Sequence, residues 1–273
     1  MRPALIASLM LLFATPVFAS TYVFAVPPRQ SRAKMKVVYG PIAKYLSTVT
    51  GDTIHLKYES NWLSYENDMR KNRFDLVFDG PSFISWRMAH EHFVPLVKLK
   101  GHLIFKIIVR KNDTRFTKVS QLAGHMICAF APPNLATLSL YSLFPDPIRQ
   151  PTVIPVKGLK TPYISLLKGK CAAAIIQAVL YKKLNAGPTH GKTRVIYTTQ
   201  PIPNQGFSAG PRIPPAVQQK IRQALLSPAG AAATALMRQE FGNRPLVPAH
   251  RAEYTGVSSL LNSVWGFSSQ AGS

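Results

Sequence analysis

Residues 74–83, FDLVFDGPSF, pass from a short apolar run through a Gly-Pro turn into the start of a helix. Asp75 to Phe78 has the composition of a buried strand, and Gly80-Pro81 ends it. A helix is predicted from Pro81-Ser82, because a proline in the first turn of a helix forfeits no helical hydrogen bond. A strand, a turn and a helix in this order are typical of a parallel sheet covered by helices.

The same alternation continues on both sides of this stretch. Strands are predicted upstream at 22–26 and 53–58, and downstream at 126–130, 152–156 and 172–176, with helices between them. Two extended segments, 102–110 and 205–209, interrupt the pattern, and helices at 215–226, 228–241 and 254–265 follow the second one. We therefore predict an α/β protein of two lobes joined by two hinge strands, with a ligand cleft between the lobes. Lobe 1 is expected at 20–104 and 205–273, and lobe 2 at 105–204.

Composition excludes several classes of protein. The chain has 273 residues, 47% of them hydrophobic, which is enough for a folded core. Its 33 Lys+Arg and 11 Asp+Glu give a formal charge of +22. The cations are dispersed and accompany no nucleic-acid-binding motif, so no nucleic-acid partner is expected. Two interpretations of the charge stay open: steering of an anionic solute, or adaptation to an acidic medium.

The N-terminus has the pattern of a secretory signal. Arg2 precedes an apolar stretch over residues 4–14, and Ala19 ends a small-residue cleavage motif. We predict a signal peptide at residues 1–19, cleaved after Ala19, and an exported protein. An oxidising compartment favours a disulfide between the two cysteines, Cys128 and Cys171, over the alternative of two buried thiols.

Several motifs together resemble one family. YGPIAKYL at 39–46, followed by residues 50–51 and 74–83, resembles the first lobe of periplasmic phosphate/phosphite/phosphonate-binding proteins, the solute receptors of ABC importers. IIVRKND at 107–113 resembles the family's crossing strand, and LKGKCAAA at 167–174 resembles the segment before its last cleft strand. The resemblance implies a two-lobed periplasmic-binding-protein fold, type II-like, in the periplasm. It implies a monomer that takes a small-molecule solute to a membrane permease, without a cofactor, a metal or catalytic residues.

The resemblance also suggests where a ligand binds. Phosphonate binders of the family typically carry a Ser-Thr-Ser run at the start of a lobe 2 helix, and this chain has PPNLAT at 132–137 instead. A small anionic solute of the phosphonate, phosphate or phosphite type is expected, and the alternative of a less charged or amine-bearing solute stays open. The candidate ligand-binding residues are Arg29, Asn61, Trp62, Phe78, Asp79, Ser82, Asn134, Leu135, Ala136, Thr137 and Gln177. For Trp62, Asn134 and Asp79 the alternatives are core packing, a helix cap and a turn residue.

The sequence leaves two alternative functions open. The same module can serve as the solute-sensing subunit of a signalling receptor. Residues 206–210, GFSAG, match the G-x-S-x-G nucleophile motif, with Glu240 and His250 in serine-hydrolase order. That motif needs a helix immediately after the serine, and Pro211 and Pro214 oppose one, so an exported serine hydrolase using Ser208 is less favoured.

Overall fold

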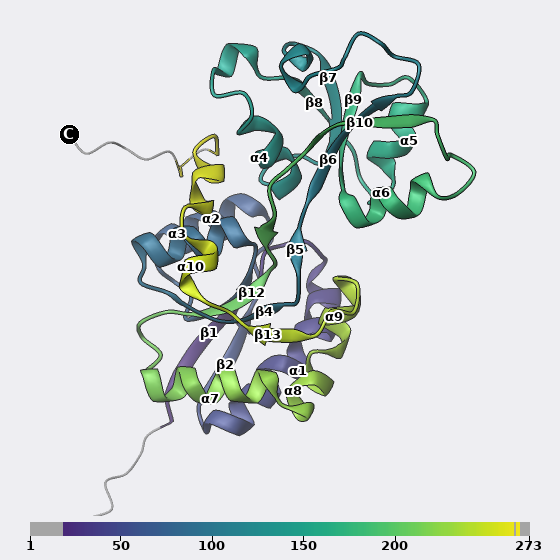
Figure 1. The fold of residues 1–273 in the computed structure, drawn as a ribbon. Helices are drawn as coiled ribbons and strands as arrows, with labels where there is room; N and C mark the ends of the chain where they lie inside the picture. The colour runs from purple at the N-terminus through teal and green to yellow at the C-terminus, as the bar shows by residue number, and fades with distance from the viewer. Residues whose placement is uncertain (1–18, 265, 268–273) are drawn as a thin grey trace, which may run out of the picture.

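The computed structural model describes residues 19–264 and 266–267, which form two α/β lobes (Figure 1). The predicted signal peptide lies outside the described residues, apart from Ala19 at its end. Among the helices of the described part of the chain, none combines the length and apolar character that crossing a bilayer requires.

The first lobe is built on a six-stranded sheet in the order β13-β4-β12-β3-β1-β2. Its strands are β1 (Thr21–Ala25), β2 (Thr53–Lys57), β3 (Leu76–Asp79), β4 (Val94–Leu99), β12 (Gly206–Ala209) and β13 (Leu246–Pro248). β1 runs parallel to β2 and β3, whereas β12 runs antiparallel to β3 and β4. This lobe therefore contains residues from both ends of the described chain.

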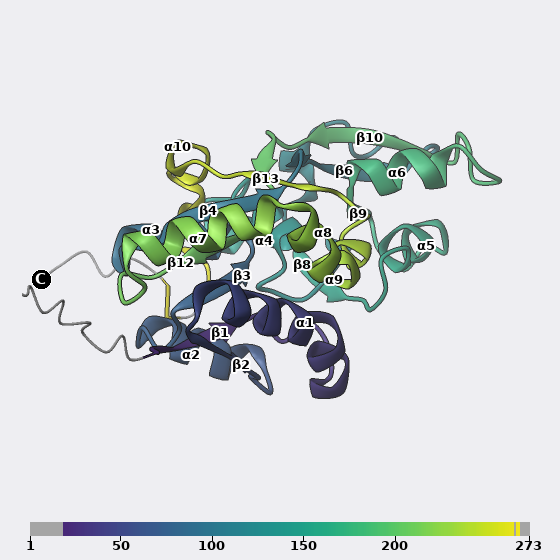
Figure 2. The ribbon, with the colours of Figure 1, turned by 90° about the horizontal axis from the view of Figure 1, so that it is seen from below.

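Helices cover both faces of this sheet. One face carries α1 (Arg32–Thr50), α7 (Pro215–Leu226), α8 (Pro228–Ala233) and α9 (Ala235–Glu240), and Figure 2 shows α1 and α7 running near each other. The other face carries α2 (Trp62–Arg70) and α3 (Pro81–His90). Successive strand residues serve opposite faces: Phe24 packs under α1, and Ala25 packs under α2 and α3. The apolar strand composition thus follows from burial on both faces.

The second lobe repeats this plan with five strands in the order β10-β6-β9-β7-β8. They are β6 (Phe105–Arg110), β7 (Met126–Ala129), β8 (Thr152–Pro155), β9 (Ala173–Gln177) and β10 (Thr193–Thr198). The helical segments are η1 (Val119–Leu122), α4 (Leu135–Tyr141), η2 (Pro147–Arg149), α5 (Thr161–Leu167) and α6 (Ala178–Asn185). The order β8-β7-β9-β6-β10 matches β2-β1-β3-β12-β4 of the first lobe, strand for strand.

A short antiparallel ladder lies where the chain crosses between the lobes. It pairs β5 (His102–Leu103) with β11 (Ile202–Pro203), on the two crossing segments. Two lobes joined by two extended connections confirm the predicted fold class. The proposed lobe boundaries, 104/105 and 204/205, stay a prediction and fall beside this ladder.

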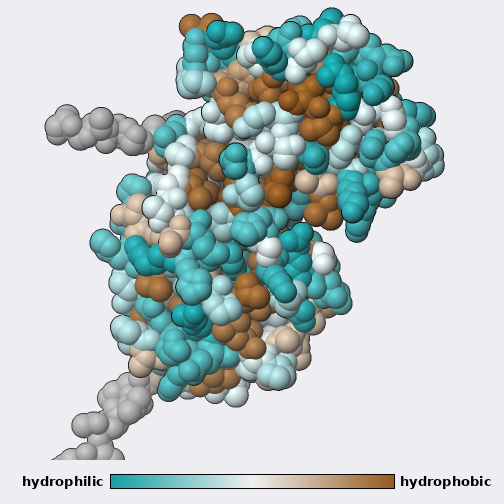
Figure 3. All heavy atoms as spheres, in the orientation of Figure 1, coloured by the Kyte–Doolittle hydropathy of each residue, from teal (hydrophilic) through white to brown (hydrophobic). Residues whose placement is uncertain are grey.

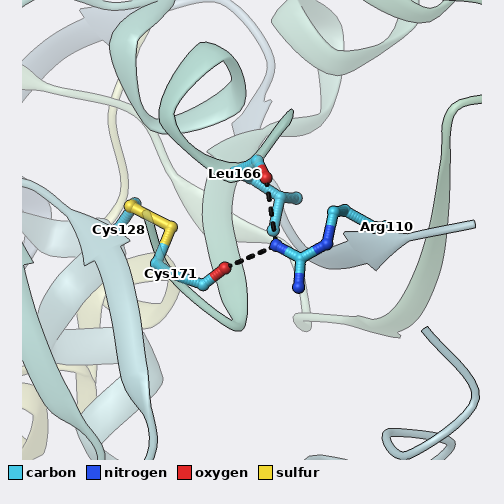
Figure 4. The surroundings of a disulfide bond; sticks show 4 residues. All are labelled: Arg110, Cys128, Leu166 and Cys171. Carbon is cyan, nitrogen blue, oxygen red and sulfur yellow. Dashed lines mark hydrogen bonds between the residues drawn. A yellow bond between two sulfur atoms is a disulfide. The ribbon is translucent and has the colours of Figure 1, made fainter. Parts of the chain in front are cut away.

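The predicted disulfide is present between Cys128 in β7 and Cys171 just before β9 (Figure 4). Both cysteines are buried, and the bond ties together two neighbouring parallel strands of the second lobe.

The C-terminal segment differs most from the sequence prediction. The single helix expected at 228–241 is divided at Thr234, whose hydroxyl donates to the Gly230 carbonyl at 2.8 Å. The helix expected at 254–265 is instead α10 (Arg251–Tyr254) and the 3-10 segment η3 (Val257–Leu261), separated at Gly256 with φ of 80°. The sequence does not predict β4 or β13. η3 lies along α3 and reaches α4 of the other lobe.

Candidate solute-binding site

Three loops of the first lobe meet at one edge of its sheet. Arg29 follows β1, Trp62 follows β2, and Gly80 follows β3. Because β3, β1 and β2 are parallel neighbours, their carboxyl ends share an edge, where ligands of open α/β sheets usually bind. The structure thus brings together the loops that carry the lobe 1 candidates.

Arg29 is the exposed cation at this edge. Its guanidinium carbon lies 5.9 Å from the ring centroids of both Trp62 and Phe241. Its Nη2 lies 3.8 Å from the position that a Cβ on Gly80 would occupy. The guanidinium is therefore placed beside the start of α3 by two aromatic rings.

The first turn of α3 has backbone N–H groups that make no hydrogen bond within the helix. Gly80 is its N-cap without a side-chain cap, and Pro81 lacks an N–H. The first helical bond runs from Ile84 N to the Gly80 carbonyl, at 3.0 Å. The N–H groups of Ser82 and Phe83 belong to the first turn, where a helix favours negative charge. Both residues are buried in this conformation.

Asp79 is fully buried in an ion-pair network behind this turn. Its Oδ2 accepts hydrogen bonds from the Tyr65 hydroxyl at 2.8 Å and from Arg87 Nε at 3.2 Å. Arg87, also fully buried, pairs with Glu91 at 2.9 Å. Burial opposes the charge of Arg87, but Tyr65, Asp79 and Glu91 raise its pKa above the ordinary value. Asp79, beside Gly80, is thus paired with a buried cation that it shares with Glu91.

Phe78 is also fully buried rather than exposed at the edge. Its ring lies 4.9 Å from that of Phe207 and 5.4 Å from that of Phe241, inside the core under α1. In this conformation the side chains of Phe78 and Asp79 are both inaccessible, and their contact with a ligand stays a prediction. Their role in the structure is to support the turn at Gly80.

A protein-family model matches most of this chain. Residues 24–254 match the family described as "ABC transporter, phosphonate, periplasmic substrate-binding protein". The chain belongs to this family. A search of curated proteins finds no significant relative.

Several solved structures share the fold of this chain. XAC2383 from Xanthomonas citri, bound to ATP, has a TM-score of 0.66 at 15% identity, covering 89% of this chain and 98% of that chain. PhnD1 from Prochlorococcus marinus, in complex with methylphosphonate, has a TM-score of 0.64 at 10% identity, covering 89% and 97%. A binding protein component of an ABC phosphonate transporter from Pseudomonas aeruginosa has a TM-score of 0.55 at 11% identity, covering 85% and 82%. At these identities the likeness establishes the fold alone.

Four lobe 2 candidates of this phosphonate-family protein, residues 134–137, lie at the start of α4. Asn134 Oδ1 accepts from the Ala136 N–H at 3.0 Å, which is the helix-cap role. The buried Thr137 hydroxyl donates to the Phe130 carbonyl at 2.5 Å. Leu135 is partly exposed beside them. The two polar side chains of this group are thus engaged locally.

α4 is close to the lobe 1 site. Its Leu138 packs in one apolar cluster with Phe83 and Tyr65, and Trp62 lies against that cluster, with its ring stacked on Phe83. Asn61 caps α2 at the exposed end, accepting from Ser64 N at 2.9 Å. Gln177 ends β9, opposite Phe105 at the start of β6.

Phe241 is the site residue that sequence reasoning missed. It follows α9, and its neighbour Glu240 accepts from Gln30 at 2.9 Å and pairs with Lys34 at 3.0 Å. These contacts bind the end of α9 to the Arg29 loop. No local sequence signal marks this pairing, because the partners lie more than 200 positions apart.

The geometry of a serine nucleophile is absent at Ser208. The residue lies within β12, paired with β3 and β4, and is fully buried. The chain continues as strand through Ala209, whereas a nucleophile elbow requires a turn and a helix. Within the described residues, no group of three or more His, Cys, Asp or Glu side chains is arranged to hold a metal ion.

Proposed function

We propose that this protein captures a small anionic solute of the phosphonate, phosphate or phosphite type between its lobes and delivers it to the permease of an ABC importer. The solute's anionic group would lie between the Arg29 guanidinium and the first turn of α3. Lobe 2 would close over it with the start of α4, near Leu135. Because Ser82 is buried in this conformation, entry requires the lobes to move apart about the β5–β11 ladder.

The observation that carries the proposal is the position of Arg29. An exposed guanidinium lies against Gly80, at the start of a ten-residue helix, and is flanked by Trp62 and Phe241. Arginine is suited to phosphonate oxygens because its planar fork donates two parallel hydrogen bonds. Asp79, the carboxylate that directly precedes Gly80, is paired with Arg87. It therefore repels an anion bound at the start of α3 less than an unpaired carboxylate would.

The net charge supports the same kind of solute. A charge of +22 raises the local concentration of anions around the molecule, and it accelerates their capture at low ionic strength. This effect is not specific to one anion, so the choice between phosphonate, phosphate and phosphite depends on the contacts in the cleft.

The test is titration calorimetry with methylphosphonate, inorganic phosphate and phosphite. At one hundred times its Kd, a ligand should also stabilise the fold by about 2.7 kcal/mol in thermal unfolding. Arg29→Ala should weaken binding at least tenfold, and Arg29→Lys should recover part of it. Lys220→Ala, which removes an exposed cation on α7, should leave the affinity within about twofold. The proposal fails if none of the three anions binds, or if Arg29→Ala binds as the unaltered protein does.

A further inference from the structure

A second basic site lies on lobe 2, away from the cleft. A pocket of about 640 Å³ is formed by the turn after β6, the end of α5 and the turn before β10. Its lining includes four cationic side chains and one carboxylate: Arg110, Lys111, Arg115, Lys192 and Asp113. These five groups carry a net charge of +3, and the proposed function assigns no role to them.

The pocket is at the opposite edge of the lobe 2 sheet from the cleft. β6 begins at Phe105 beside the hinge and ends at Arg110, so the pocket lies roughly 17 Å further out, at about 3.3 Å per residue. Val109 pairs with Ala173 at the start of β9, whereas α4 and α6 begin at the ends of β7 and β9. In Figure 3, polar residues predominate on the outer part of this lobe. A ligand in the cleft would therefore not reach this pocket.

The two arginines of the pocket are held in place by the protein. Arg115 donates to both oxygens of Asp113, at 2.9 and 2.8 Å, and Arg110 donates to the same carboxylate at 3.2 Å. Hydrogen bonds from Arg115 lower the pKa of Asp113 to about 2, so this carboxylate is charged at neutral pH. Arg110 also donates to the carbonyls of Leu166 and Cys171, the latter beside the disulfide (Figure 4). One carboxylate thus orients two guanidinium groups.

The two lysines of the pocket are adjacent and share no carboxylate. The backbone N–H of Lys111 donates to the Lys192 carbonyl at 2.8 Å, which places the two residues side by side where β6 and β10 end. Both side chains are exposed, and within the described residues neither forms an ion pair. Two ammonium groups on adjacent backbones repel each other, and an anion with several charges relieves that repulsion.

The rest of lobe 2 offers little competing negative charge. Residues 105–204 contain 14 Lys+Arg and two Asp+Glu, a net charge of +12. The second carboxylate, Asp146, caps η2 by accepting from Ile148 N at 3.0 Å. The pocket is thus a concave part of this cationic surface in which one carboxylate holds two guanidinium groups.

We propose that this pocket binds clustered phosphate groups, on a soluble polyphosphorylated molecule or on adjacent anionic phospholipid headgroups. Arg110 and Arg115 provide pre-oriented donors to phosphate oxygens, and Lys111 and Lys192 provide charge at the rim. A pocket of this volume accommodates several phosphate groups. Four cationic side chains also match a ligand with several negative charges better than a ligand with one.

The test uses the full exported chain and two probes, inorganic tripolyphosphate and phosphatidylglycerol vesicles, with phosphatidylcholine vesicles as the neutral reference. Affinities are measured at 150 mM NaCl, so that long-range charge effects are screened. The Lys111→Ala/Lys192→Ala variant should lose at least tenfold in affinity for the probe that binds. The matched control, Lys182→Ala/Lys183→Ala, removes two exposed charges from α6 of the same lobe and should lose less than threefold. In an Arg29→Ala background, which disables the proposed cleft site, the same lysine pair should still cause a tenfold loss, and this separates the pocket from the cleft.

The two probes distinguish the sources of the phosphate groups. Loss confined to tripolyphosphate assigns a soluble ligand, and loss confined to the vesicles assigns a lipid surface. The proposal is overturned if neither probe binds saturably, if the two double variants lose affinity equally, or if Arg29→Ala alone abolishes binding. The first two results would reduce the pocket to non-specific surface charge, and the third would assign the binding to the cleft.

Discussion

Lobe 1 and lobe 2 share one strand order but are stabilised by different chemistry. The first contains a buried ion-pair network, in which Arg87 contacts Asp79 and Glu91 and all three are at most 5% exposed. The second contains a buried disulfide, Cys128–Cys171, between its two central parallel strands. The shared topology follows from a shared apolar pattern, whereas the internal cross-links depend on individual residues.

The difference extends to the surface charge. The lobe 1 ranges, 20–104 and 205–273, contain 18 Lys+Arg and nine Asp+Glu, against 14 and two in 105–204. Several lobe 1 carboxylates are structural: Asp75, for example, accepts from the Val23 N–H at 2.7 Å and pairs with Arg212. Lobe 2 has few such carboxylates, so its cations stay largely unbalanced. The carboxylates that stabilise lobe 1 thus also lower its net positive charge. Lobe 2 has few carboxylates, so its net positive charge attracts anions more strongly.

The largest effect is expected from breaking the lobe 1 network. Arg87→Met should destabilise the protein by about 3–5 kcal/mol, because two buried carboxylates lose their cation. Urea unfolding measures this loss, and hydrogen exchange should locate it in β3, α2 and α3. Arg73→Met, which removes the 55% exposed partner of Asp68, is the control and should cost less than about 1 kcal/mol. Equal losses in the two variants would contradict a special role for the buried network.

The sequence predicted the strands of both sheets better than the interactions between them. Apolar runs followed within two residues by Gly or Pro locate β1, β3 and β7, because burial on both faces imposes that composition. β2, β8 and β9 were also predicted, although neither β2 nor β9 is followed directly by Gly or Pro. β4 was missed, since Pro95 interrupts its apolar run. The Cys128–Cys171 bond was predictable because an exported chain with two cysteines allows one intramolecular pairing.

The candidate site was only partly predictable. Arg29, Trp62 and Gly80 follow predicted strands, so the rule for parallel sheets places them at one edge. Arg87 was missed: it lies within α3 and resembles a surface residue, although Glu91 four positions later is a local signal for a pair. Its other partners, Tyr65 and Asp79, come from different elements, and only the folded chain brings them together.

A smaller effect is expected from removing the lobe 2 cross-link. The Cys128→Ala/Cys171→Ala variant should lose about 3–4 kcal/mol, because the disulfide closes a loop with a sequence separation of 43 residues. Urea unfolding with and without dithiothreitol measures the loss. Reduction should destabilise the unaltered protein by a similar amount and leave the variant unchanged. Hydrogen exchange should rise in β7 and β9 and stay constant in β3. A loss centred on lobe 1 would refute independent stabilisation of the lobes.

The smallest effect, on pH dependence, contrasts a carboxylate from each lobe. Burial raises the pKa of Glu66 in α2 to about 7, although Arg70 opposes the shift, and its side chain is 6% exposed. Between about pH 4.5 and 7 the native state then binds more protons than the unfolded state, so Glu66 lowers stability as pH rises. Glu66→Gln should remove this penalty, and it should raise the free energy of unfolding at pH 8 relative to that at pH 4 by about 2–3 kcal/mol.

Asp113→Asn is the matched change in lobe 2, and its effect should have a different form. The pKa of Asp113 is lowered to about 2 by Arg115, so it is already charged in the folded protein at pH 4. Its contribution is lost only as the pH falls below about 4, and Asp113→Asn should therefore cost a nearly constant amount, under about 1 kcal/mol, between pH 4 and 8. Urea unfolding at several pH values compares the two variants. If the unfolding free energies of Glu66→Gln and Asp113→Asn changed with pH in the same way, the prediction would be contradicted. The buried carboxylate of lobe 1 and the ion-paired carboxylate of lobe 2 would then not differ as their surroundings predict.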